Sequence, residues 1–224
     1  MVKFVEDELA ALKNEVLDMW TLVDQQMKVA CKAVSEMDCE VARQIVAHEK
    51  MVNSFDLKID SMVEDIIALY TPVAVDLRFV LAMHNINNNL ERIGDYAEGL
   101  ARFVMRSSEE PVDGDLIKAL RLSDMFERVI GMLETARTAF AESDLQLAKT
   151  VTSLDDEVDS INANSVRILT EYATVHPQSM RLCLELGGVF RKLERTGDHV
   201  NNIIEDIVFY MEAMVLKHSG KHNG

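Results

Sequence analysis

The sequence predicts an all-α protein made of two tandem antiparallel three-helix bundles that arose by internal duplication. Apolar residues recur at three- and four-residue steps along much of the 224-residue chain, which is the spacing of one helix face. The chain has 9 glycines, 3 prolines and 13 methionines, a composition that favours helices over sheets. The phrase Leu-Glu-Arg-X-Gly-Asp also occurs twice, at 90–95 and at 193–198, so the two halves repeat one design.

Two helices are expected before residue 71. An apolar stripe at helical spacing predicts the first helix over about residues 4–34. Asp38 is expected to cap the second helix, because a side-chain oxygen there can accept hydrogen bonds from the first free backbone N–H groups. The second helix is expected to end at Tyr70. Both stripes are typical of the seam of a helical bundle.

A break at Thr71-Pro72 separates the second helix from the third. Thr71 is expected as the N-cap and Pro72 as the first helical residue, since proline is favoured at that position. The third helix is then predicted over about residues 73–105. The following stretch, Ser-Ser-Glu-Glu-Pro-Val-Asp-Gly-Asp at 107–115, is dense in turn formers. It divides the chain into two predicted three-helix repeats, residues 1–108 and 109–224.

The second half repeats the order of the first. Three helices are expected, over about 115–142, 145–174 and 179–217. The breaks between them fall at Ser143-Asp144 and at His176-Pro177. Because short turns make neighbouring helices antiparallel, each half is expected to run up, down and up.

The two halves can be aligned residue by residue. Five residues recur 106 positions later: Ala33, Glu36, Asp38, Ala42 and Val52 recur as Ala139, Glu142, Asp144, Ala148 and Val158. Pro72 recurs as Pro177 at an offset of 105, and the repeated phrase recurs at an offset of 103. The drift falls near the second interhelix turn, where loop length is free to vary. The halves are therefore copies of one three-helix unit.

The charge and the cysteines restrict the function classes. The formal net charge of −15 repels nucleic-acid phosphates, so metal cations and basic protein surfaces are better partners. The cysteines have no Cys-x-x-Cys spacing, which fits a reducing interior: Cys31, Cys39 and Cys183. No apolar run approaches the ~18 residues of a membrane span, and the N-terminus lacks signal-peptide features. A soluble, cytoplasmic protein is expected.

Each copy of the repeated phrase places two carboxylates four residues apart on one helix: Glu91 with Asp95, and Glu194 with Asp198. Both side chains of such a pair point from the same helix face. Each copy also has a glycine inside the helix, at a cost of about 1 kcal/mol relative to alanine. A cost that is repeated in both halves indicates a requirement. Because the paired acids repel each other, we expect a cation between them.

The alignment assigns a second polar pair to each half. Asp155 and Asp159 on the second helix of the second half correspond to Glu49 and Asn53 in the first. These pairs are expected to face the acidic pairs of the third helices. Oxygen donors from two helices can surround Mg²⁺, Mn²⁺ or Ca²⁺, and they can also hold iron or zinc, so the metal is not identified. Since Asn53 replaces an acid, the second half is predicted to hold the stronger site.

Other interpretations compete with the metal site. Acids at this spacing are common on exposed helices, and Arg92 or Arg195 can make each motif a structural ion-pair node. His48 and His199 adjoin the motifs but point about 100° away, so they are weaker ligand candidates. Ferritin-like di-iron bundles require Glu-x-x-His pairs, and the chain has none. The sequence also lacks a phosphate loop and a supported nucleophile, so it does not predict an enzyme.

The quoted motifs resemble the PhoU family of phosphate-signalling proteins. The resemblance rests on Leu-Glu-Arg-Ile-Gly-Asp-Tyr-Ala, on Thr-Pro-Val-Ala-Val-Asp-Leu-Arg-Phe-Val at 71–80 and on Leu-Glu-Arg-Thr-Gly-Asp-His-Val-Asn-Asn-Ile. It extends over nearly the whole chain and includes the tandem three-helix organisation.

The resemblance implies a cytoplasmic regulator that is not an enzyme. Such a protein mediates between the phosphate-specific ABC transporter, at its ATPase subunit, and a sensor histidine kinase, and it restrains phosphate uptake. A homodimer is implied, with metal ions or multinuclear clusters at the two motifs. By position the ligands are Glu91, Asp95, Glu194, Asp198, Asp155, Asp159, Glu49 and Asn53. Two alternatives remain open: an accessory protein of a Pit-type phosphate carrier, and a metal–carboxylate bundle without a signalling role.

Overall fold

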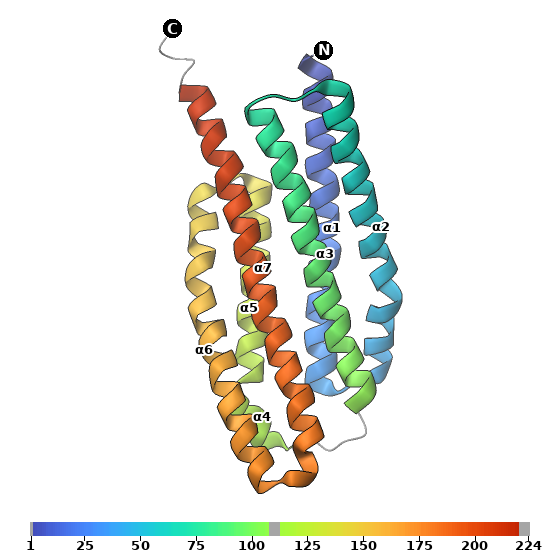
Figure 1. Ribbon diagram of the computed structural model, residues 1–224, viewed down its shortest axis with the longest axis vertical. Helices are drawn as coiled ribbons and strands as arrows, with labels where there is room; N and C mark the ends of the chain where they lie inside the picture. The colour runs from blue at the N-terminus through green and yellow to red at the C-terminus, as the bar shows by residue number, and fades with distance from the viewer. Residues whose placement is uncertain (1, 108–112, 220–224) are drawn as a thin grey trace.

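The computed structural model describes residues 2–107 and 113–219, and this part of the chain is a bundle of long helices. Figure 1 shows them running side by side along the long axis of the molecule. The helices are α1 Val2–Glu36, α2 Cys39–Tyr70, α3 Val75–Ser107, α4 Gly114–Leu120, α5 Leu122–Glu142, α6 Leu145–Val175 and α7 Met180–Ser219. A short 3₁₀ turn at Pro177–Ser179 connects α6 to α7. The described residues include no strand, and the predicted all-α fold of tandem bundles is confirmed.

The two bundles pack side by side along their length. Helix α3 lies against α7 and α1 lies against α5, while α2 and α6 are at opposite edges (Figure 1). Trp20 of α1 stacks on Phe140 of α5, with ring centroids 5.7 Å apart. Tyr210 of α7 meets both Phe140 and Phe79 edge to face. The two halves therefore share one apolar core. The predicted boundary at residues 108 and 109 lies outside the described residues.

The turns after α1 and α5 show the duplication in three dimensions. Met37 and Ser143 both have left-handed backbones, with φ of 50° and 55°. In both turns the following aspartate caps the next helix. The Asp38 and Asp144 carboxylates accept hydrogen bonds from the backbone N–H groups two and three residues further on. The predicted cap at Asp38 and the break at Ser143-Asp144 are confirmed.

The expected start of the third helix is wrong. Thr71 is not an N-cap: it ends α2 in a left-handed conformation with φ 47° and ψ 59°. Pro72 is not helical either, and Ala74, with φ 48°, precedes the first residue of α3, Val75. The proline ring disfavours the helical conformation for the residue before it, so α2 has to end at Tyr70.

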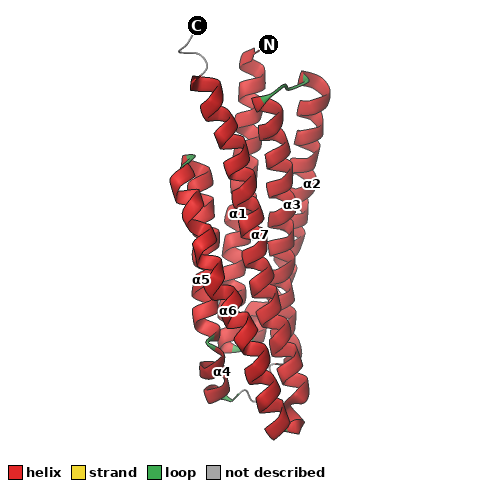
Figure 2. Cartoon of the chain, turned by 60° about the vertical axis from the view of Figure 1, so that its left-hand side comes forward, coloured by secondary structure: helices red, strands yellow, loops and turns green. Residues whose placement is uncertain are grey.

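The helix expected over 115–142 is interrupted. Arg121 has a left-handed backbone with φ 54° and ψ 37°, and it separates α4 from α5. Its side chain donates hydrogen bonds to Asp124 and to Glu157 of α6. The change of direction places α4 against α6 (Figure 2). Leu116 and Leu120 of α4 are buried. Local sequence does not mark this break, because it serves a contact with a distant helix.

No helix within residues 2–107 or 113–219 combines the length and apolar character that crossing a membrane requires.

Candidate functional site

The second-half site lies between α6 and α7, which pack against each other. The pKa of Asp155 is raised by burial and by the charges of Asp159 and Asp198. Burial, followed by the charges of Asp198 and Asp159, likewise raises the pKa of Glu194. Charges on α6 and α7 therefore act on each other across the two helices, and they make Asp155 and Glu194 harder to ionise.

Asp155 is the most enclosed part of this site. Its Oδ2 accepts a hydrogen bond from Asn201 Nδ2 at 2.5 Å, whereas its buried Oδ1 has no hydrogen-bond partner. A Cβ atom on Gly197 would lie only 2.7 Å from that Oδ1. The glycine in the second motif therefore leaves room for a carboxylate against the backbone of α7, which explains the requirement that the sequence indicated.

A cavity of about 450 Å³ opens beside Glu194 and Asp198. Its lining residues are polar or charged: Asn162, Arg191, Glu194, Arg195, Asp198, His199 and Asn202. Both acids of the second motif therefore face a space that also holds two guanidinium groups.

The first-half site is arranged differently. Arg92 lies 3.6 Å from a Glu91 oxygen and 3.3 Å from an Asp95 oxygen. On α2, Asn53 Nδ2 donates a hydrogen bond to Glu49 Oε1 at 2.5 Å. Burial and then Asp95 raise the pKa of Glu91, while Arg92 opposes them. The ion-pair interpretation thus describes the first motif, whose charges are partly neutralised within the chain.

The glycine of the first motif serves helix packing. A Cβ atom on Gly94 would lie 3.1 Å from Val52 Cγ1 on α2. The two glycines are equivalent in sequence, yet one makes room for an apolar side chain and the other for a carboxylate.

Sequence reasoning missed a polar cluster of the first half. Asn87 is fully buried, and its Nδ2 donates to Asp56 Oδ1 at 2.8 Å and to Asp60 Oδ1 at 3.2 Å. His84 Nδ1 lies 3.0 Å from the same Asp60 oxygen. The four-residue spacing of Asp56 and Asp60 was a visible signal, but alignment of the halves concealed it, because the second half has no equivalent pair.

The two motifs meet at the contact between α3 and α7. Tyr96 and His199, which follow the last acid of each motif, lie 3.3 Å apart between the hydroxyl oxygen and Nε2. The other ring nitrogen of His199 lies 2.7 Å from Asn89 Oδ1, and burial lowers the pKa of His199. His199 therefore joins the two halves, whereas the other histidine candidate, His48, is exposed.

The acidic residues of the second half fit a metal ion only in part. Within the described ranges, no three His, Cys, Asp or Glu side chains are gathered so that they could hold a metal ion. The oxygen donor set, the raised pKa values of Asp155 and Glu194 and the unpartnered Asp155 Oδ1 do fit the chemistry of a hard cation. The second half therefore supplies suitable donor atoms but no completed coordination shell.

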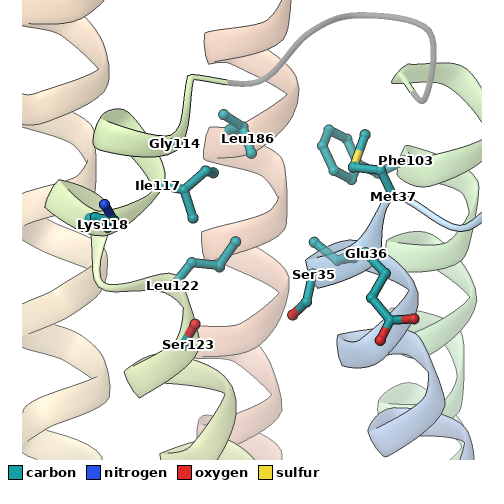
Figure 3. A pocket seen from close by; sticks show the side chains of 11 residues that line it. Ser35, Glu36, Met37, Phe103, Gly114, Ile117, Lys118, Leu122, Ser123 and Leu186 are labelled. Atoms are coloured by element: carbon teal, nitrogen blue, oxygen red, sulfur yellow. The ribbon is translucent and has the colours of Figure 1, made fainter.

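A further cavity, of about 510 Å³, lies at one end of the bundle (Figure 3). Its walls are mainly apolar and come from α1, α3, α4, α5 and α7, with Phe103, Ile117, Leu122 and Leu186 among them. None of the predicted site residues lines it.

The fold and the acidic motifs define a class of protein, a duplicated helical bundle with an acidic pair on the last helix of each half. The model of the PhoU domain matches residues 16–104 and 122–207. The chain therefore belongs to the PhoU family.

Individual relatives support the assignment of the chain to this family. The chain is 31% identical to the phosphate-specific transport system accessory protein PhoU homolog 1 of Thermotoga maritima, covering 91% of this chain and 87% of that protein. It is 30% identical to the phosphate-specific transport system accessory protein PhoU of Escherichia coli, covering 95% and 87%. The crystal structure of PhoU from Pseudomonas aeruginosa is similar with a TM-score of 0.88 and 29% identity, covering 92% of this chain and 98% of that one.

Proposed function

We propose that this protein is a metal-binding cytoplasmic regulator of phosphate uptake and phosphate-starvation signalling. Its relatives are accessory proteins of the phosphate-specific transport system, which supports a role beside a phosphate transporter. The observation that carries the metal-binding part is the second-half site. There Asp155, Asp159, Glu194 and Asp198 interact across two helices, and one buried carboxylate oxygen has no partner.

A bound cation at that site would supply positive charge between carboxylates that otherwise repel each other. Asp155 and Asp159 belong to α6, and Glu194 and Asp198 belong to α7. Binding to the folded state alone would therefore hold the two helices together and raise the free energy of unfolding by mass action. This role needs no catalytic group, and we propose a regulator and not an enzyme.

The adaptor role requires surfaces for partners. Helices α2 and α6 lie at opposite edges of the molecule (Figure 1). Both carry exposed apolar side chains: Leu57 and Leu69 on α2, and Val166 and Val175 on α6. Burying such side chains against a partner would contribute favourable free energy. We propose that these edges serve contacts with the transporter ATPase subunit, with a sensor histidine kinase and with a second copy of the chain.

The metal-binding part is tested by titrating the metal-free protein with Mg²⁺ and with Mn²⁺ in a calorimeter. Glu194→Gln is expected to weaken binding by about tenfold or more, because it removes a charged oxygen donor. Glu171→Gln is the matched control, since it removes an exposed carboxylate of α6 that pairs with Arg167. Equal affinities for the two variants and the wild type would contradict the proposal.

The regulatory part is tested in cells by deleting the gene. Phosphate uptake and the expression of phosphate-starvation genes are both expected to rise. Unchanged uptake and unchanged expression would contradict the regulator role. If deletion alters uptake through a Pit-type carrier and leaves starvation genes unaffected, the partner of this protein is that carrier, and not the ABC transporter and the kinase.

A further inference from the structure

We propose that the cavity beside Glu194 and Asp198 binds a small tetrahedral oxyanion, such as inorganic phosphate, together with the cation held by those carboxylates. The inference rests on the proposed metal binding and adds a second ligand to the same site. Its basis is the composition of the cavity wall, which combines two acids with five residues that can donate hydrogen bonds.

The donors of this wall are largely unused. Among the residues that the structure describes, the side-chain N–H groups of Arg191, Asn162 and Asn202 donate to no protein acceptor, although all three line the cavity. Arg195 interacts with the Tyr96 hydroxyl from the other half of the molecule. Guanidinium groups bind phosphate-like oxyanions through paired hydrogen bonds, and amide groups can add single ones.

The charge of the cavity explains why the two ligands would bind together. Glu194 and Asp198 contribute two negative charges to the cavity wall, and Arg191 and Arg195 contribute two positive charges. The empty cavity is therefore close to neutral. A divalent cation on the carboxylates would add two positive charges, so an anion would be attracted once the cation is present.

Comparison of the halves shows that this wall is particular to the second. Arg191 and Asn202 correspond to Asn88 and Gly99 at the offset of 103, and Asn162 corresponds to Asp56 at the offset of 106. The first half therefore has an amide in place of the guanidinium, no side chain in place of one amide, and an acid in place of the other amide. Duplication supplied two equivalent places, and only the second has acquired the donors that an oxyanion needs.

The experiment is a calorimetric titration of the full chain at constant ionic strength, adjusted with sodium chloride. It has four arms: Mg²⁺ alone, inorganic phosphate alone, phosphate at saturating Mg²⁺, and Mg²⁺ at saturating phosphate. Phosphate is expected to bind about tenfold or more tightly with Mg²⁺ than without it, within the usual range of coupling between sites. Because coupling is reciprocal, phosphate must tighten Mg²⁺ binding by the same factor.

Two variants locate the site. Arg191→Gln is expected to weaken phosphate binding about tenfold while Mg²⁺ binds as tightly as before or more so, because a nearby positive charge is removed. Arg167→Gln is the control, since it removes the same charge from an exposed position on α6. It is expected to leave both affinities within about twofold of the wild type.

The outcomes separate this inference from the proposed function. If Mg²⁺ binds but phosphate binds neither with it nor without it, the inference is overturned and the metal-binding function stands. Phosphate binding that is insensitive to Mg²⁺ or to Arg191→Gln also overturns it, because the anion then binds elsewhere. If neither ligand binds, both proposals fail.

Discussion

Replacing Gly197 with alanine tests the geometry of the second-half site. Alanine is favoured over glycine inside a helix by about 0.8–1.0 kcal/mol. Gly131 of α5 provides the reference, since a Cβ there meets nothing within 4 Å, and Gly131→Ala is expected to raise the free energy of unfolding by about that amount. At Gly197 the new Cβ would lie 2.7 Å from Asp155 Oδ1, so the carboxylate has to move.

Moving Asp155 would disturb its hydrogen bond from Asn201, which is worth about 1 kcal/mol. That loss offsets the helical gain, so Gly197→Ala is expected to leave the stability of the metal-free protein nearly unchanged. The melting temperature of Gly131→Ala should then exceed that of Gly197→Ala by about 2–4 °C for a chain of this size. Gly197→Ala should also weaken metal binding, whereas Gly131→Ala should not.

Chemical unfolding and metal titration of both variants measure these differences. If Gly197→Ala stabilises the protein as much as Gly131→Ala and leaves metal affinity intact, the glycine is not there to accommodate the carboxylate. Retained stability with lost metal affinity would support the geometry, because the backbone would be intact while the ligand was displaced.

Three further predictions concern single groups. Burial and three acidic neighbours raise the pKa of Asp155, so its contribution to stability is present below the unfolded value of about 3.9 and is lost as pH rises through the folded value. Asp155→Asn is therefore expected to exceed the metal-free wild type in stability at pH 7 and to match it at about pH 3, as measured by urea unfolding. Burial raises the pKa of the Cys31 thiol to about 12, so iodoacetamide at neutral pH should label Cys31 only after unfolding, as mass spectrometry can show. Arg121 has a left-handed backbone, so Arg121→Gly should be about 1 kcal/mol more stable than Arg121→Ala, and equal stabilities would contradict the assigned conformation.

The sequence was sufficient to predict the elements that depend on local chemistry. Apolar periodicity identified the long helices, because each has to bury one face against its neighbours. The caps at Asp38 and Asp144 were predictable since an aspartate before a helix satisfies its first N–H groups. Thr71 was misassigned because its role depends on which of two adjacent helices it belongs to, and it ends the earlier one.

Features that depend on distant contacts were not predictable. The left-handed residue Arg121 interrupts a stretch with good helical periodicity, because α4 packs on α6 and not along the axis of α5. Similarly, the alignment of the halves predicted which acids face each other, but not the environment of each pair. Whether Arg92 turns toward Glu91 and Asp95 depends on side-chain packing that the motif does not encode.

The difference between the two motif copies follows from how each balances its own charge. In the first copy, Arg92 lies beside both acids, so the pair is stabilised within the chain. The equivalent Arg195 instead interacts with Tyr96 across the contact between the halves. Within the described residues, no arginine lies within ion-pair distance of Glu194 or Asp198, although the charges of Arg195 and Arg191 still lower the pKa of Glu194. We therefore expect a cation from solution to gain more by binding to this pair than to the first. Duplication produced equal copies, and the placement of one arginine side chain is the reason that we predict the second to be the better receptor for charged ligands.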